Sequence, residues 1–448
     1  MVPDPWFPAD APPEAVGRRP GLFAALRHRN YRLFFIGQLI SLIGTWMQRI
    51  AQAWLVLQIT NSPFLLGVIG ALQWLPVLCL ALIGGVVADR VRKRNLIVVT
   101  QTVQMIQAFI LGALIVTGVV RFWHVAILAT ILGTSQAFDM PSRQAFIFEM
   151  VEGTDMMNAV ALNSTIVNVA RLIGPAIAGA AIAWVGMSWA FFVNGLSFIP
   201  VILALLMMRV RPSQTVSVTA GVMAHLREGI DYLIRTPVAL QVIVLLAFES
   251  VFVMNFTILT TVFAKNVLNM QAAAFGLLMS AQGAGALVGA ITIASLAYLG
   301  PRPAMLFGGA LALTVSSIVL STIRHFAPAA VVLGVAGASM VMFTATVNTT
   351  LQLNTPDRLR GRVMAIYSLM MGGMTPVGSL VTGALAEIWG APGAFGVGGT
   401  VGLVALAGVF RWHLRAASAA EAASAAGHLG AVGEVVGAAG GDAEEGGR

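Results

Sequence analysis

Long apolar runs recur along the chain and are separated by short segments that carry glycine, proline or charge. A helix of about 20 apolar residues crosses the hydrocarbon core of a bilayer, so the pattern predicts membrane-spanning helices. The alternation over about ten residues that marks a transmembrane strand is not seen, which favours helices over a β-barrel. Twelve spans are predicted, at about 31–59, 64–88, 95–118, 122–140, 158–184, 188–208, 237–262, 272–297, 303–323, 327–352, 363–388 and 392–412.

Positive charge falls mainly on alternate loops. Of the 26 Lys and Arg residues, only Arg121, Lys265 and Arg324 lie in the loops on the other side of the predicted membrane. Because positively charged loops remain on the cytoplasmic side of a membrane, these alternate loops and both termini are predicted to be cytoplasmic, and the location expected is the cytoplasmic membrane of a bacterium. The net charge of +8 is then explained by the positively charged cytoplasmic loops, and nucleic-acid binding is not expected.

The longest interior loop divides the spans into two sets of six. In this loop Leu226, Ile230 and Leu233 lie at helical spacing opposite Arg227 and Asp231, which predicts an amphipathic helix at the cytoplasmic interface. The expected fold is all-α, with twelve transmembrane helices in two pseudo-symmetric six-helix bundles, an organisation typical of alternating-access transporters. The predicted domains are a cytoplasmic tail at 1–30, a first bundle at 31–208, a linker at 209–236, a second bundle at 237–412, and a disordered or weakly helical cytoplasmic tail at 413–448.

Composition supports a membrane protein and argues against an enzyme. Hydrophobic residues make up 58% of the chain, charged residues 10%, and the mean hydropathy is +0.86, which is more apolar than a soluble domain requires. Neither Lys93 nor Lys265 follows a glycine, so the sequence has no G-K-[ST] phosphate loop. The six histidines show no metal-ligand spacing, and the single Cys79 allows no internal disulfide. No enzyme activity, cofactor or metal site is expected.

Four motifs in order along the chain resemble those of one transporter family. The segment 85–94, GVVADRVRKR, resembles the signature G-x-x-x-D-R-x-G-R-R of the major facilitator superfamily, with Arg92 in place of its second glycine. The others are DMPSRQAF at 139–146, Asn163-Ser164 with RLIGP at 171–175, and PDRLRGRV at 356–363. Together they resemble the transmembrane secretion effector branch, which includes enterobactin exporters, and the resemblance covers about 22–412.

The resemblance implies a monomeric secondary transporter that exports a small organic solute, a siderophore or a drug-like amphiphile, in exchange for protons across the lipid bilayer. Two alternatives stay open at this point: a lysolipid translocator of the same fold, and a membrane scaffold that transports nothing. Charged residues at the predicted midplane argue against a scaffold, because a charge there is expensive and usually functional.

Charged residues at the predicted cytoplasmic ends of the spans suggest a conformational gate. Asp89 ends the second span, where the helix dipole disfavours an anion, so it requires a partner such as a loop arginine or the start of span eleven near Arg362. Pro141 predicts that span four ends or kinks there. Asp139 and Arg143 would pair across that kink or with the opposite half, and the alternative is an ordinary interfacial ion pair. The candidate gate residues are Asp89, Arg90, Arg94, Asp139, Arg143, Arg360 and Arg362.

Small residues in two spans predict a close helix contact. Span five carries Gly174, Pro175 and Gly179, and span eight carries Gly285 and Gly289 at four-residue spacing. The family resemblance places these spans side by side, and small residues let helices approach closely in a membrane. Simple packing is the alternative to a role in transport.

Polar side chains inside the spans are the candidate cavity residues. In span one, Gln38, Ser41, Thr45, Gln48, Arg49 and Gln52 share one helical face, which must line an aqueous cavity or contact protein. Glu249 lies near the middle of span seven and Arg171 near the middle of span five. A carboxylate at that depth is disfavoured unless paired, hydrated or protonated, so Glu249 is the candidate carrier of exchangeable protons. An ion pair of Glu249 with Arg49 or Arg171 is the alternative, and the charge of the substrate stays open.

Overall fold

A computed structural model describes residues 23–151, 155–208, 222–296, 300 and 302–441, and every regular element in these ranges is helical. The first half contains a short helix Ala24–Arg27, α1 Arg29–Thr60, α2 Pro63–Arg90, α3 Lys93–Val116, α4 Phe122–Met150, α5 Met156–Trp184 and α6 Met187–Met207. A helix α7, Val222–Arg235, precedes the second half. The second half contains α8 Pro237–Phe252, α9 Phe256–Asn266, α10 Ala272–Leu296, α11 Pro303–Thr322, α12 Phe326–Asn354, α13 Asp357–Ser368, a π-helical turn η4 Leu369–Gly373 and α14 Thr375–Gly441.

Twelve membrane crossings account for these helices. Ten stretches in the described ranges are long and apolar enough to cross a membrane, and one of them, Asp357–Ala416, contains a sharp break. At Gly390 the backbone has φ 68° and ψ 176°, a conformation open mainly to glycine, so the chain reverses there and α14 comprises two crossings. The twelfth crossing is α4, which packs against α2 and α3. The expected all-α fold is confirmed.

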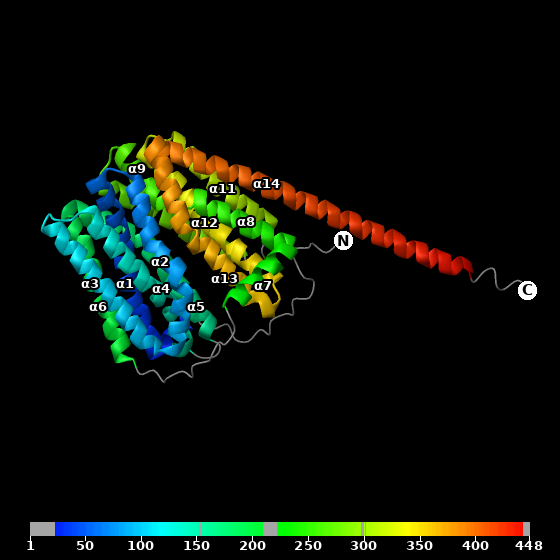
Figure 1. Cartoon of the computed structure of the whole chain (residues 1–448), viewed down its shortest axis with the longest axis horizontal. Coiled ribbons are helices and arrows are strands. Elements are labelled where there is room, and N and C mark those ends of the chain that lie inside the picture. Colours follow the sequence, from blue (N-terminus) through cyan, green and yellow to red (C-terminus); the bar gives the residue numbers. More distant parts are fainter. Residues whose placement is uncertain (1–22, 152–154, 209–221, 297–299, 301, 442–448) are drawn as a thin grey trace, which may run out of the picture.

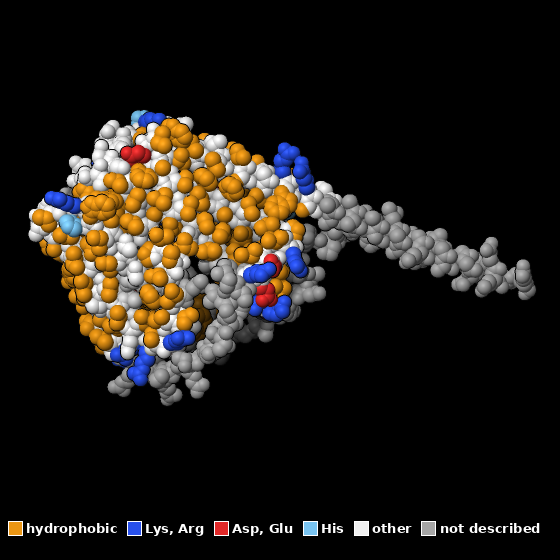
Figure 2. Space-filling model, viewed as in Figure 1, with side chains coloured by type: hydrophobic (Ala, Val, Ile, Leu, Met, Phe, Trp, Pro, Cys, Tyr) orange, Lys and Arg blue, Asp and Glu red, His pale blue; other side chains and the backbone are white. Residues whose placement is uncertain are grey.

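The outer surface has the character of a membrane protein. Figure 2 shows hydrophobic side chains over the flank of the molecule, with Lys and Arg gathered towards its two ends. Large apolar side chains such as Trp184, Trp123 and Ile388 are among the most exposed. A continuous exposed apolar belt of this kind is compatible with lipid and not with water.

The buried core is single on one side of the molecule and divided on the other. One cluster, here called the joined core, takes residues from both halves, among them Leu57, Leu66, Phe263, Phe275 and Phe395. The opposite side has two separate clusters, one built from α1, α3, α4, α5 and α6 and the other from α7, α8 and α11 to α14. The halves therefore meet at one end and separate towards the other, as Figure 1 shows.

Glycines bring the two halves together at the joined core. A Cβ added to Gly67 of α2 would lie 2.4 Å from the Ser379 carbonyl oxygen and 3.1 Å from Gly383 Cα, both on α14. The halves also meet where α5 packs against α10, and there a Cβ on Gly179 of α5 would lie 2.9 Å from the Ala273 carbonyl oxygen of α10. Since neither position leaves room for a side chain, each contact is one of backbone against backbone.

The structure corrects the predicted role of Gly285 and Gly289. Spans five and eight do lie side by side, but α10 faces α5 through Gly276 and Gly283. Gly285 and Gly289 instead face α12, where an added Cβ would lie 1.7 Å and 2.5 Å from the carbonyl oxygens of Gly334 and Ala338. Small residues occur on two faces of α10, and their spacing alone does not indicate which neighbour each face contacts.

Pro141 does not end span four. Helix α4 continues to Met150, although proline at 141 removes the amide that would bond to the Ala137 carbonyl. That carbonyl lies against Gly84 of α2, where an added Cβ would be 2.2 Å from its oxygen. Of the two predicted outcomes at Pro141, an end or a kink, the end is wrong.

Two spans of the second half are interrupted, which the sequence pattern did not predict. Span seven is divided into α8 and α9, and span eleven passes through the π-helical turn η4 before α14. For the chain after residue 412, disorder or weak helix was expected, and α14 continues as a helix to Gly441. Residues 442–448, most of the predicted tail 1–30 and part of the linker lie outside the described residues.

Candidate functional site

A cavity lies between the two halves beside the joined core. It encloses about 690 Å³ of empty space, including its open mouth. Its walls come from α1 and α2 in the first half, and from the α8–α9 break, α9 and α14 in the second. The side chains are a mixture of amides, hydroxyls and apolar groups, with one cation: Arg49, Gln52, Ala53, Leu66, Ile69, Gln73, Trp74, Met254, Asn255, Thr257, Ile258, Thr375 and Ser379, beside Gly70.

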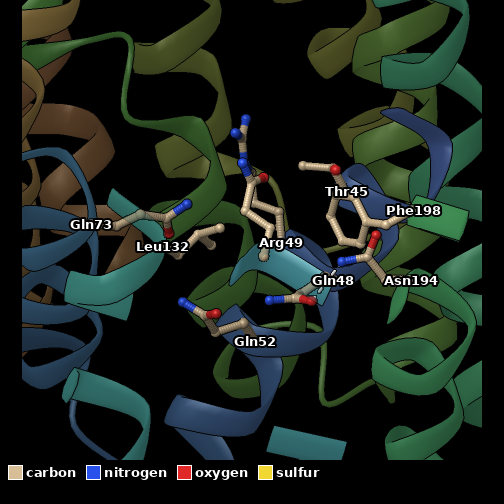
Figure 3. Close-up of a pocket in the computed structure, with 9 residues that line it drawn as sticks. Thr45, Gln48, Arg49, Gln52, Gln73, Leu132, Asn194 and Phe198 are labelled. Atoms are coloured by element: carbon tan, nitrogen blue, oxygen red, sulfur yellow. Dashed lines mark hydrogen bonds between the residues drawn. The ribbon is translucent and has the colours of Figure 1, made fainter. Parts of the chain in front are cut away.

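A smaller pocket in the first half, about 280 Å³ including the space open to solvent, lies next to this cavity. Arg49, Gln52 and Gln73 line both spaces, so the two are adjacent. Figure 3 shows the Arg49 side chain extending away from Gln48 and Gln52. The remaining lining residues are Thr45, Gln48, Gln104, Leu132, Asn194 and Phe198. Arg49 thus lies between a polar pocket and a larger cavity with both polar and apolar walls.

The predicted polar face of span one is divided between two environments. Gln38 and Ser41 are buried against protein, whereas Thr45, Gln48, Arg49 and Gln52 line the smaller pocket, and Arg49 and Gln52 also line the larger cavity. Gln48 accepts a hydrogen bond from Asn194 Nδ2 at 2.6 Å and donates one to Gln107 Oε1 at 2.8 Å. Neither amide atom of Gln38 has a hydrogen-bond partner among the described groups.

A row of buried glutamines on α3 was missed by the sequence reasoning. Gln101, Gln104 and Gln107 are each buried and spaced three residues apart. Gln101 and Gln107 bond to Ser41 and Gln48 of α1, and Gln104 bonds to Ser135 of α4. Their spacing was a readable signal, because residues three apart share one helical face. Buried amides of this kind fix how the helices of the first half pack.

Arg49 and Arg171 converge on one tryptophan. The guanidinium carbon of Arg49 lies 4.4 Å from the centroid of the Trp46 ring, and that of Arg171 lies 5.3 Å from it. A cation over a tryptophan face is attracted by the ring quadrupole. No carboxylate among the described residues lies within ion-pair distance of either arginine, and the buried Nε of Arg171 has no hydrogen-bond partner there.

Glu249 lies inside the second half and not in the cavity wall. Its side chain is fully buried, Oε1 accepts a hydrogen bond from Thr314 Oγ1 of α11 at 3.0 Å, and Oε2 has no partner among the described groups. Gly402 of α14 also packs beside it. The alternative of an ion pair between Glu249 and Arg49 or Arg171 is therefore wrong for this conformation.

The break in span seven connects Glu249 to the cavity. The Glu249 carbonyl accepts hydrogen bonds from the amides of Val253 and Met254, at 3.0 and 2.9 Å, where α8 ends. Asn255 then donates its side-chain amide to the Ser250 and Val251 carbonyls, each at 3.1 Å. Because Met254 and Asn255 line the cavity, the main chain that follows Glu249 reaches the cavity wall.

Three predicted gate residues of the first half, Asp139, Arg143 and Arg94, have partners within that half. Asp139 is fully buried, forms an ion pair with Arg143, and accepts hydrogen bonds from Thr100 Oγ1 at 2.8 Å and Gln101 Nε2 at 3.1 Å. Arg94 donates to the Met208 carbonyl at 3.1 Å. The exposed Arg90 closes α2, and the side chain of Asp89 lies outside what the structure describes.

The gate residues of the second half contact the linker helix and their own helix. Arg362 forms an ion pair with Glu228 of α7, and Arg360 pairs with Asp357 at 2.6 Å. Tyr232 of α7 also donates a hydrogen bond to the Asn354 carbonyl. The amphipathic helix α7 is thus docked on the second half. No ion pair among the described residues joins the charged ends of the two halves.

Comparison with solved structures agrees with this architecture. The chain resembles the nucleoside transporter NupG with a TM-score of 0.68 at 12% identity, over 87% of this chain and 99% of that one. It resembles a bacterial homologue of the iron transporter ferroportin, solved in an inward-facing state, with a TM-score of 0.62 at 15% identity, over 86% and 98%. At these identities the likeness is one of fold.

Sequence comparison identifies the family. The chain is 25% identical to the staphyloferrin A transporter of Staphylococcus aureus over 379 residues, which cover 82% of this chain and 92% of that protein. It is 24% identical to the multidrug efflux pump Tap of Mycolicibacterium fortuitum, over 81% and 90%. The sequence pattern of transmembrane secretion effectors matches residues 20–439. The chain therefore belongs to the transmembrane secretion effector family of the major facilitator superfamily, whose members are transporters and not enzymes.

Proposed function

We propose that this protein exports a small organic solute, a siderophore or a drug-like amphiphile, by alternating access in exchange for protons. The observation that carries the proposal is a cavity between two halves that are joined at one side and separated at the other. The names of the relatives, a staphyloferrin A transporter and a multidrug efflux pump, support a solute of this size. With both termini cytoplasmic in a bacterial membrane, the separated side is the cytoplasmic one, and the protein acts as a monomer.

Glu249 is the residue that we propose carries the exchanged proton. It has no cation within ion-pair distance among the described residues, and one of its oxygens has no hydrogen-bond partner. A buried carboxylate without such compensation is costly, and a proton removes that cost. Protonation would change the carboxylate and its hydrogen bond with Thr314 of α11, on the residue whose main-chain carbonyl lies at the end of α8.

Transport in proteoliposomes tests the proposed function. We expect vesicles with the protein inserted inside-out and an acidic lumen to accumulate rhodamine 6G or carboxyfluorescein above the external concentration. Collapse of the pH gradient with nigericin should release the accumulated dye, and protein-free vesicles provide the control. Equal dye concentrations on both sides despite a maintained gradient would rule out proton-driven export of these probes.

The proposed gate gives a second expectation, for Asp89→Asn. In the present conformation Arg362 pairs with Glu228, so the partner that Asp89 would take in the opposite state is held by α7. Loss of the Asp89 charge should weaken only the state in which the cytoplasmic ends meet. We expect transport to slow about tenfold while dye affinity stays nearly unchanged, because the substitution biases a two-state equilibrium.

Matched variants separate this effect from a general effect of charge. Asp231→Asn, on the exposed face of α7, should leave the transport rate unchanged. Glu228→Gln should release Arg362 and shift the equilibrium in the direction opposite to Asp89→Asn. A wild-type transport rate in Asp89→Asn would show that this carboxylate has no part in the gate.

A further inference from the structure

We infer that the exported solute carries an anionic group, a carboxylate or phosphate, which is bound by Arg49 and Arg171 beside the Trp46 ring. The inference rests on the proposed export function and adds the chemical class of the substrate. Its basis is a pair of arginines within the membrane-spanning helices that are close to one another and lack a counter-charge among the described residues.

Two like charges at one place in a membrane protein require an explanation. A charged side chain within the bilayer normally pairs with an acid or faces water, because the uncompensated charge is expensive. Two other cations of the spanning helices follow this rule, since Arg143 pairs with Asp139 and Lys93 with Glu149 at 2.7 Å. Among the described residues, Arg49 and Arg171 share only the Trp46 ring, which compensates a cation weakly compared with a carboxylate.

The chain positions this pair through a glycine. Gly174 lies one turn after Arg171 on α5, and a Cβ there would lie 2.5 Å from Trp46 Cβ of α1. The missing side chain lets α1 and α5 approach closely at Trp46, which brings Arg171 over the same ring as Arg49. This gives Gly174, predicted from the sequence as a packing residue, a specific part in forming the site.

The cavity favours an organic anion over a cation or a small inorganic ion. Arg49 lines it, whereas no Asp or Glu is among its described lining residues, so a cationic solute would find no opposite charge. Leu66, Trp74 and Ile258 provide an apolar wall next to the amides Gln52 and Gln73. A solute with an anionic head and an apolar or aromatic body matches this arrangement.

Two dyes of the same ring system and opposite charge test the inference. Binding of carboxyfluorescein and rhodamine 6G to the purified full chain in lipid nanodiscs is measured by fluorescence anisotropy. We expect tighter binding of the anionic dye by the wild type. Arg49→Gln and Arg171→Gln should each raise its Kd about tenfold or more, because each removes a charge-assisted hydrogen-bond donor, with little change for rhodamine 6G.

Two further variants show that a loss is due to charge at this site. Arg171→Lys, which keeps the charge, should retain more affinity for carboxyfluorescein than Arg171→Gln does. Arg324→Gln, which removes an arginine exposed near the outer end of α11, should bind both dyes as the wild type does. Displacement of the anionic dye by sebacate would support a free carboxylate as the natural ligand, and displacement by lysophosphatidylglycerol alone would support a lipid phosphate.

The wild type alone can overturn the inference. Equal or tighter binding of rhodamine 6G, or no binding of carboxyfluorescein, would contradict an anion site even if both glutamine variants failed to fold. Gradient-driven export of rhodamine 6G would in that case leave the export function standing. Anion binding without gradient-driven movement of either dye would support the site and contradict proton-coupled export.

Discussion

Glu249→Gln is expected to abolish uphill, pH-gradient-driven export and to retain exchange of labelled for unlabelled substrate. Glutamine preserves the shape of the side chain and its contact with Thr314 Oγ1, now 3.0 Å from Glu249 Oε1, but it fixes the group in a neutral form. Exchange needs only the movement of the loaded protein between its two states, whereas accumulation needs a group that takes up and releases a proton. Proteoliposomes with and without an imposed pH gradient measure the two activities separately.

The control for this experiment keeps the titrating group and alters its neighbour. Thr314→Ser preserves the hydroxyl donor and should support accumulation close to that of the wild type. Full accumulation by Glu249→Gln would remove Glu249 from the mechanism and make Asp139 the next candidate. Loss of both activities with a monodisperse, folded protein would mean that the carboxylate is needed for movement between states and not for proton coupling alone.

Asp139→Asn is expected to be the most destabilising of the conservative acid-to-amide changes considered. Asp139 is fully buried and joins Arg143, Thr100 and Gln101. Removal of one partner from a buried ion pair costs about 3–5 kcal/mol. We expect the lower end of that range, because Arg143 is partly exposed and can turn towards water. Thermal unfolding of the detergent-solubilised protein, followed by tryptophan fluorescence, measures the loss.

Asp231→Asn again serves as the comparison, since it removes an acid from an exposed position of α7. Its unfolding temperature should match that of the wild type. An equal, small shift for both variants would contradict a structural role for the Asp139 network. It would place this carboxylate among residues that act only when the cytoplasmic ends of the halves meet.

The twelve crossings were predictable because hydropathy is a property of each segment alone. The interruptions of spans seven and eleven were not predictable. Nothing in the apolar run around Val253, for example, indicates that α8 ends there. The break depends on contacts from another span: a Cβ on Gly378 of α14 would lie 2.5 Å from Asn255 Nδ2. Likewise, α4 continues through Pro141 with Gly84 of α2 packed against the Ala137 carbonyl, a contact that the local sequence of span four does not indicate.

The site was predictable residue by residue but not in its grouping. Charge inside an apolar run singled out Arg49, Arg171 and Glu249 from the sequence. Their spacing in the chain does not tell which of them meet. In the structure the two arginines share Trp46, and the glutamate lies in another half-molecule beside Thr314. Trp46 itself was overlooked, because an aromatic residue in a membrane span is ordinary on composition alone.

The polar contacts at the joined side and at the separated side of the molecule differ in how they respond to salt. At the joined side the halves meet through glycine backbones, and two charged side chains bond to neutral partners across the halves: Lys265 donates to the Leu57 carbonyl, and Glu387 accepts from Ser62 and the Phe64 amide. At the separated side Glu228 holds Arg358 and Arg362 through exposed ion pairs, which ionic strength screens. Rising ionic strength would therefore weaken the docking of α7 on the second half, while the contacts between the halves at the joined side would change little.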